Sequence, residues 1–192
     1  TAYKGGIYTD RSANYIITDN INMKNANITY MDMHNAGVFY GNLDGQFHTV
    51  SNPPVAFFIE TAGTTSKAVL IENLIITNST AAYTGENVAV NHMCSSALVV
   101  YNSGVLKVSK VMLSNSVLQG SLDGGGLVGK SDHAKTGADV TLDQCVSNGV
   151  KIIGHSTGYR VLGGLAGYIC NSRITNNFSI KSEISSPNSQ NQ

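Results

Sequence analysis

Apolar and polar residues follow one another in short runs along this chain, and helical periodicity is almost absent. The apolar runs are rich in β-branched and aromatic side chains, and Gly, Asn, Ser and Asp separate them. Runs of that length and content are typical of β-strands. We therefore expect strands at 15–18, 55–59, 69–77, 97–101, 106–114, 140–146 and 173–180. The pattern predicts an all-β fold.

One of these runs recurs with the same apolar and polar positions. The stretch from Ile71 aligns with the stretch from Val108 at an offset of 37 residues; Leu142 follows at 34 and Ile174 at 32. An apolar phrase precedes each copy, reading VAFFIE, SALVVYN, GGLVGKS and GGLAGYI in turn. A period in the thirties with two or three short strands is typical of one coil of a parallel β-solenoid.

The phrase Gly-Gly-Leu-(Val/Ala)-Gly occurs twice, 38 residues apart. Its positions are Gly125, Gly126, Leu127 and Gly129 in the first copy and Gly163, Gly164, Leu165 and Gly167 in the second. We interpret the phrase as a corner of the coil, where glycines adopt positive φ and pack closely against the next coil. Leu98, Leu127 and Leu165 should then form one internal ladder. An antiparallel sandwich is the alternative, and Asn148-Gly149 is its main hairpin signal.

The repeated phrase resembles the GLUG motif, named for its Gly-Leu-any-Gly core, here residues 126–129 and 164–167. The strands that follow, LDQC and ITNN, are similar to the I-x-N-C strand of that family. Residues 15–23 and 39–52 resemble the family's opening pair of strands, and the matching positions there are Leu43, Asp44, Gly45 and His48. These segments cover most of residues 15–180, although VAFFIE and SALVVYN stand where the glycine phrase is expected.

The resemblance implies a right-handed parallel β-helix, here of about five to six irregular coils over residues 1–184. The composition of residues 185–192, SSPNSQNQ, predicts a disordered tail or linker. The resemblance also implies a bacterial protein that is extracellular or on the cell surface. Such repeats occur in large adhesins and in the non-catalytic stem of IgA1-protease-like zinc metallopeptidases. Family proteins often begin with a capping helix, and residues 1–14 do not predict one. An uncapped coil edge favours pairing with another chain.

Charge narrows the partners that this chain is expected to bind. The 192 residues include 12 basic and 12 acidic side chains, a low share with a net charge of zero and no basic stripe. We therefore expect no nucleic-acid partner. No apolar run approaches the roughly 18–20 residues that cross a bilayer, so we expect no membrane insertion. A polar but uncharged surface is typical of extracellular β proteins.

Candidate catalytic and metal-binding residues all have a plainer interpretation. Asp44 and His48 in LDGQFH suggest an acid–base pair, but we assign them to a turn and to packing; Asp123 in LDGGG is likewise assigned to a turn. The H-E-x-x-H zinc signature is absent, and the five histidines are scattered singly, with only His133 beside an aspartate. We expect no catalytic residue, no cofactor and no metal.

A β-helix can also be a polysaccharide lyase or hydrolase, and such enzymes need several carboxylates in one groove. Most of the acids here stand in turn contexts. We expect equivalent repeat positions to form a mixed, solvent-facing ladder: Glu72, Ser109, Asp143 and Thr175. A carbohydrate-active enzyme therefore remains the less favoured alternative.

The cysteines do not decide the compartment. Cys94, Cys145 and Cys170 are odd in number and fit no C-x-x-C spacing. Cys145 occupies an apolar position of the repeat, so we interpret it as a small buried thiol. Disulfide pairing stays open.

Our primary hypothesis is a non-catalytic β-helical module, adhesive or structural, whose partner is a host glycan or surface protein. Inserts that break the period often carry binding in solenoids, and they supply the candidate surface residues Tyr83, His92 and Tyr159. The alternative is a self-assembling filament or surface-layer subunit that stacks end to end through uncapped coils.

Overall fold

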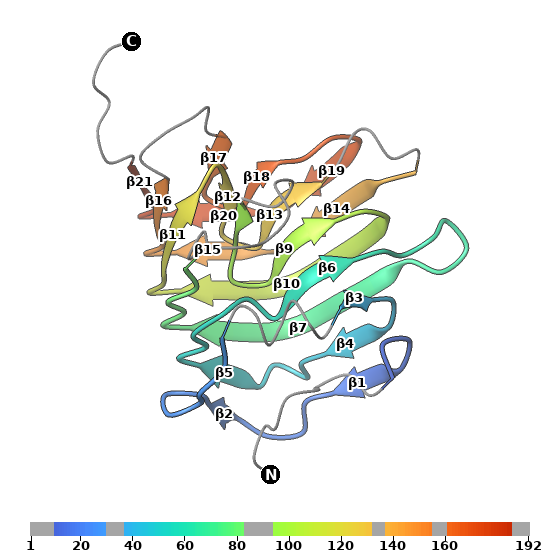
Figure 1. The fold of residues 1–192 in the computed structure, drawn as a ribbon, viewed down its shortest axis with the longest axis horizontal. Coiled ribbons are helices and arrows are strands. Elements are labelled where there is room, and N and C mark those ends of the chain that lie inside the picture. The colour runs from blue at the N-terminus through green and yellow to red at the C-terminus, as the bar shows by residue number, and fades with distance from the viewer. Residues whose placement is uncertain (1–9, 30–36, 83–93, 132–136, 155–160, 186–192) are drawn as a thin grey trace.

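The chain folds into a stack of parallel strands with no helix in the part that the structure describes. This computed structural model describes residues 10–29, 37–82, 94–131, 137–154 and 161–185. Every strand pair in those ranges is parallel. Figure 1 shows the strands climbing from the N-terminal to the C-terminal end. The predicted parallel β-helix is confirmed, with about five coils, and the antiparallel sandwich is wrong.

Sheet A has ten strands and runs the whole length of the stack. One line of strands is β1 (Asn14–Ile16), β4 (Asn42–Asp44), β7 (Val69–Thr77), β10 (Val105–Ser114), β14 (Asp139–Asp143) and β19 (Ser172–Thr175). The second line is β2 (Ile21–Asn22), β5 (Thr49–Ser51), the later halves of β7 and β10, β15 (Val146–Asn148) and β20 (Phe178–Ile180).

Three smaller sheets complete the coil. Sheet B contains β3 (Val38–Phe39), β6 (Phe58–Thr61), β9 (Val99–Asn102), β13 (Val128–Ser131) and β18 (Ala166–Tyr168). Sheet C contains β11 (Val117–Ser121), β16 (Lys151–Gly154) and β21 (Glu183–Ser185). Sheet D contains β8 (Cys94–Ser95), β12 (Asp123–Gly125) and β17 (Val161–Gly163). A full coil visits sheets B, A, C and D in that order.

The strand register confirms the repeat that the sequence predicts. Val108 pairs with Ile71 on one side and with Leu142 on the other, and Leu142 pairs with Ile174. The predicted leucine ladder is also present, because the Leu127 amide donates to the Leu165 carbonyl at 2.8 Å. In sheet B the register places Val99 beside Val128, so Leu98 lies beside Leu127.

Inward-facing residues fill the space that the sheets enclose. Ile71, Val108 and Leu142 are fully buried in one row, and Phe39 stacks on Phe58 with their ring centroids 4.5 Å apart. The alternate residues of sheet B point to its other face, where Val100 joins a second, smaller cluster. Burial of stacked apolar side chains is the main favourable term in holding successive coils together.

The glycine phrase forms a corner, as predicted, but for a different reason. Gly126 and Leu127 lie in the bend between β12 and β13. The expectation of positive φ is wrong, because none of the glycines in either copy of the phrase adopts it. Close approach excludes a side chain instead: a Cβ on Gly129 would lie 2.6 Å from the Val100 carbonyl oxygen, and one on Gly167 would lie 2.5 Å from that of Gly129.

Left-handed residues form two other corners of the coil. One stack, between the two halves of sheet A, contains Asn73, Lys110, Gln144 and Asn176. The other, where the chain leaves sheet A for sheet C, contains Asn52, Asn78, Asn115, Gly149 and Lys181. Asn tolerates this conformation better than most residues. Asn148-Gly149 is therefore such a corner, and its interpretation as a hairpin signal is wrong.

The LDGQFH segment makes the turn that was assigned to it. The Gln46 amide donates to Oδ1 of Asp44 at 2.9 Å, and the His48 amide donates to the Gly45 carbonyl at 2.8 Å. Leu43, just before the turn, is buried. A Cβ on Gly45 would lie 2.5 Å from the Asn73 carbonyl oxygen of the next coil. The turn fits closely against its neighbour.

Gly129→Ala and Gly149→Asn should separate the two kinds of corner. Alanine at 129 overlaps the backbone of the adjacent coil, so we expect a loss of about 1–3 kcal/mol in the free energy of unfolding. Asparagine tolerates φ of 64° better than most residues, and a Cβ at 149 would lie 3.2 Å from Oδ1 of Asn115 instead of overlapping backbone, so the loss should be smaller, below about 1 kcal/mol. Urea unfolding measures both, and equal losses would contradict this distinction.

Candidate interaction surface on sheet A

Sheet A presents its outward side chains in straight rows, because each strand pairs in register with the next. One row follows the predicted ladder, with Glu72, Ser109, Asp143 and Thr175 in register. Asp44 precedes Glu72 in the same row. Neighbouring strands lie about 4.8 Å apart, so Asp44 and Glu72 are adjacent in this row, and Asp143 lies two strands beyond Glu72.

Two of these carboxylates tie one coil to the next. Oδ1 of Asp143 accepts hydrogen bonds from Oγ1 of Thr175 at 2.8 Å and from Nδ2 of Asn176 at 3.1 Å. These bonds hold the pKa of Asp143 below its ordinary value. Oδ1 of Asp44 accepts from Nδ2 of Asn73 at 3.0 Å. Both carboxylates therefore bind the corner of the following coil.

A second outward row is apolar. Ile75, Met112, Val146 and Phe178 lie in register, each between residues that point inward. Met112 is 37% exposed and Phe178 is 60% exposed, whereas Leu113 beside Met112 is fully buried. We call these four residues the apolar row. An exposed apolar strip rimmed by polar side chains marks an interaction surface.

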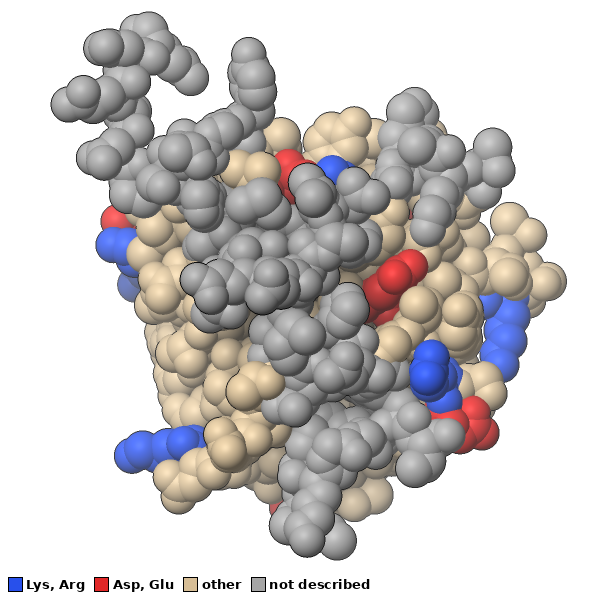
Figure 2. Space-filling model, in the orientation of Figure 1, with Lys and Arg blue, Asp and Glu red and all other residues tan. Residues whose placement is uncertain are grey.

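Polar side chains border the apolar row on its other side. That border is a row of residues in register with one another, Ser51, Thr77, Ser114 and Asn148. The next position of the row, in the last coil, is the apolar Ile180. On the face of the molecule in Figure 2, the visible charged side chains lie singly or in small groups. Toward the row of Glu72, the apolar row is bordered by Asn73, Lys110, Gln144 and Asn176, of which only Lys110 is charged.

Sequence reasoning missed the apolar row because the second half of the long strand is continuously apolar. Leu74, Ile75 and Ile76 follow one another, and alternation cannot show which of them faces solvent. The left-handed Asn73 resets the alternation, so that Leu74 and Ile76 point inward. The equivalent corner residues of the later coils are Lys110, Gln144 and Asn176, so no single residue type signals the reset.

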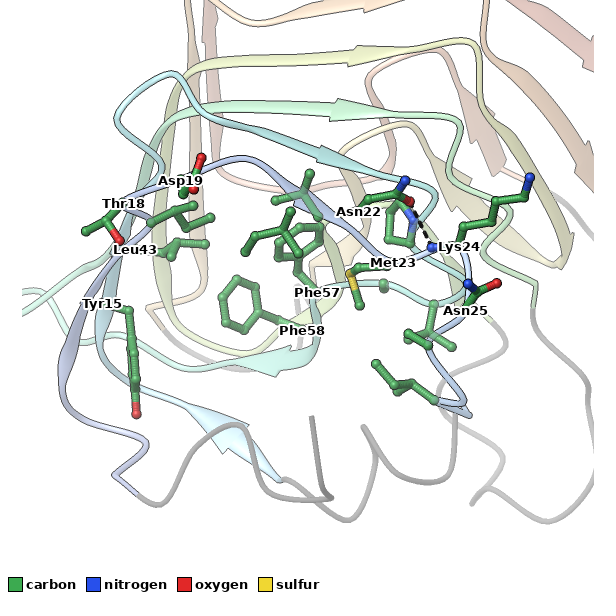
Figure 3. A pocket seen from close by; sticks show the side chains of 18 of the residues that line it. Tyr15, Thr18, Asp19, Asn22, Met23, Lys24, Asn25, Leu43, Phe57 and Phe58 are labelled. Atoms are coloured by element: carbon green, nitrogen blue, oxygen red, sulfur yellow. Dashed lines mark hydrogen bonds between the residues drawn. The ribbon is translucent and has the colours of Figure 1, made fainter. Parts of the chain in front are cut away.

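A cavity of about 1140 Å³ opens at the N-terminal end of the stack. Figure 3 shows Phe57, Phe58 and Met23 lining its middle, with Asp19 and Lys24 toward opposite rims. The cavity lies inside the coil, where the first turn of the chain covers the core incompletely. Its lining belongs to the apolar interior rather than to a set of convergent polar groups.

Asp123 is not a turn residue, contrary to the sequence interpretation. It is the first residue of β12, and its carboxylate lies 3.0 Å from Nζ of Lys130. The same ammonium lies 5.5 Å from the ring centroid of Tyr168, which is one strand away. This group fastens sheet D to sheet B across the glycine corner.

The remaining site predictions divide between described and undescribed segments. Tyr83, His92 and Tyr159 lie outside the described residues, as does His133. Within the described ranges, no group of three or more His, Cys, Asp or Glu side chains is placed to hold a metal. In the same part of the chain there is no helix of the length and apolarity needed to cross a membrane.

The three cysteines are free thiols. Cys145 is fully buried, as predicted, and its Sγ lies 3.4 Å from the Asp143 carbonyl oxygen. Burial raises the pKa of Cys145 to about 11 and that of Cys94 to about 12. Cys170 is only half-buried.

This chain matches no protein-family model, no curated protein and no solved structure. The β-helix is therefore established by its own strand pairing, and any family assignment depends on the motifs in the sequence.

Alkylation should distinguish the three thiols. The thiolate is the reactive form, and burial suppresses it at Cys94 and Cys145. We expect iodoacetamide at about pH 8 to modify Cys170 in the folded protein and all three cysteines in urea. Peptide mass spectrometry reads out each site. Native labelling of Cys94 at the rate of Cys170 would contradict the burial.

Acid should loosen the last coil through Asp143. A carboxylate whose folded-state pKa lies below its ordinary value of 3.8 stabilises the fold above that value, and the effect disappears as pH falls through the lowered pKa. We expect the urea midpoint to fall between about pH 5 and about pH 3 by more in the wild type than in Asp143→Asn. Asn keeps an acceptor for Thr175 but does not titrate. An equal fall of the urea midpoint in the wild type and in Asp143→Asn would contradict a stabilising role for the Asp143 carboxylate.

Proposed function

We propose that this chain is a non-catalytic β-helical module of a secreted or cell-surface bacterial protein, of the GLUG-motif type, with an adhesive or structural role. The observation that carries the proposal is the apolar row on sheet A, which is exposed at Met112 and Phe178, half-buried at Ile75 and Val146, and bordered by polar rows. Its partner is a host glycan or a surface protein that lies along the stack.

The construction of the coil supports a binding role for this row. Parallel pairing fixes Met112 between Ile75 and Val146, and the buried neighbours on both sides hold the strand in place. A surface that is already ordered loses little conformational entropy when a partner docks. Phe178, at the C-terminal end of the row, offers an aromatic face on which a sugar ring can stack.

A carbohydrate-active enzyme is less well supported. Asp44 and Asp143 accept hydrogen bonds from corner residues of the next coil, so both have a structural task. Glu72 lies two strands from Asp143, about 10 Å along the row. A row of this kind suits a stalk or an adhesive face better than a catalytic groove.

A double substitution of the apolar row tests the adhesive role. We expect the full chain to bind members of a glycan array or a panel of host surface proteins, and Met112→Ser with Phe178→Ser to weaken that binding roughly tenfold or more. The matched control is Leu70→Ser with Val117→Ser, since both residues are exposed but lie outside the row.

Equal weakening by the control pair would show that the row is not the binding face. Binding to no member of either panel would remove the adhesive role and leave the structural one. Turnover of a polysaccharide by the wild type, lost in Glu72→Gln, would replace the proposal with the enzymatic alternative.

A further inference from the structure

Within the described residues, the strands at both ends of sheet A pair with a neighbouring strand on one side only. Among the described residues, β1 pairs only with β4 and β2 only with β5. At the other end, β19 pairs only with β14 and β20 only with β15. Each of these outer edges presents backbone N–H and C=O groups that can accept a further parallel strand.

Side chains that belong to the core reach the surface at these two ends. In the inward row of β14, Leu142 is fully buried, while Ile174 in the same row of the last coil is 51% exposed. At the first coil, Ile21 is 44% exposed, although Val50 in its row is buried. The interior is therefore apolar at both ends, and neither end coil is covered as the middle coils are.

We propose that the last coil of one molecule pairs in parallel with the first coil of a second copy. Thr175 of one copy then lies beside Ile16 of the next, and Ile180 lies beside Asn22. The proposal deepens the structural role proposed above and rests on it, since it names a second copy of this chain as the partner.

A second copy fits because it repeats an interface that the chain already makes five times. Each strand line of sheet A adds coils in one direction, with the inward and outward rows kept in register. A shift of one residue would turn every inward side chain to the outside, so the apolar rows select one register. In that register, Ile174 of one copy lies at the start of the inward row of the next copy, the row that contains Leu43.

The corner lengths of the two end coils are compatible. Three residues separate Thr175 from Ser179 in the last coil, and four separate Ile16 from Ile21 in the first. The chain already accommodates a larger difference between its second and third coils. Five residues separate Asp44 from Val50 there, against three in the paired segment of β7. A local bulge absorbs such a difference without loss of register.

Stacking also covers the N-terminal cavity. Its lining includes the buried core residues Leu43 and Phe58 together with the exposed Ile16 and Ile21 of the first coil (Figure 3). The last coil of a preceding copy would bring Ile174 over this opening. Apolar surface would leave water on both partners, which supplies a driving force for association that parallel edges alone lack.

Cysteine cross-linking between two differently substituted chains tests the register. In a Cys170→Ser background, Thr175→Cys is mixed with Ile16→Cys, and Ile180→Cys is mixed with Asn22→Cys. The exchanged mixtures, Thr175→Cys with Asn22→Cys and Ile180→Cys with Ile16→Cys, are the controls. Neighbouring strands lie about 4.8 Å apart, within disulfide range, so we expect roughly tenfold more heterodimer in the matched mixtures.

Equal yields in matched and exchanged mixtures, or no disulfide in any of them, would overturn the proposal. Sedimentation velocity gives a second readout: Ile174→Lys should reduce the association of the wild type to monomer, and Leu70→Lys, an exposed change in the middle of the sheet, should not. A wild type that stays monomeric at its highest soluble concentration also overturns it. If the monomeric Ile174→Lys variant still bound a glycan or a protein, the adhesive role would stand even where the stacking proposal fails.

Discussion

Backbone hydrogen bonding between successive coils, parallel and in register, is the constraint on which the rest of this structure depends. It converts a sequence of irregular period into straight rows of side chains. The spacing from Leu43 to Ile71 is shorter than that from Ile71 to Val108, yet all three lie in one row. Once the rows exist, burial, corner conformation and surface pattern all repeat from coil to coil.

The sequence predicted the fold well because its strongest signal was the repeat itself. The repeat aligns Ile71, Val108, Leu142 and Ile174, and the strand pairing reproduces those offsets. The predicted runs at 55–59 and 97–101 overlap β6 and β9 of sheet B, whereas the sequence predicts no strand of sheet C or sheet D. Strands such as β16 and β17 have only three or four residues, and so short a run carries no periodicity that distinguishes it from a loop.

The candidate surface was harder to predict, because it depends on which neighbour of a left-handed residue faces outward. Met112 lies in a continuous apolar run, and only the αL conformation of Lys110 shows that Val111 and Leu113 point inward. The sequence interpretation assigns the left-handed corner conformation to glycine, whereas asparagine adopts it in this structure. The glycines at 125–129 are required by close contact between coils, which a sequence without coordinates cannot display.

Connections between sheets B and A differ widely in length from coil to coil, whereas the corners of sheet A vary only from three to five residues. Seven residues lie between β6 and β7, but only Ser103 and Gly104 lie between β9 and β10. The molecule therefore combines a nearly constant sheet A with connections whose length can change. Distances along the axis come in whole steps of the strand spacing, while the connections can change size and chemistry without disturbing any other coil. Such a molecule can accept insertions in the connections between sheets B and A, while sheet A keeps a regular spacing along the axis.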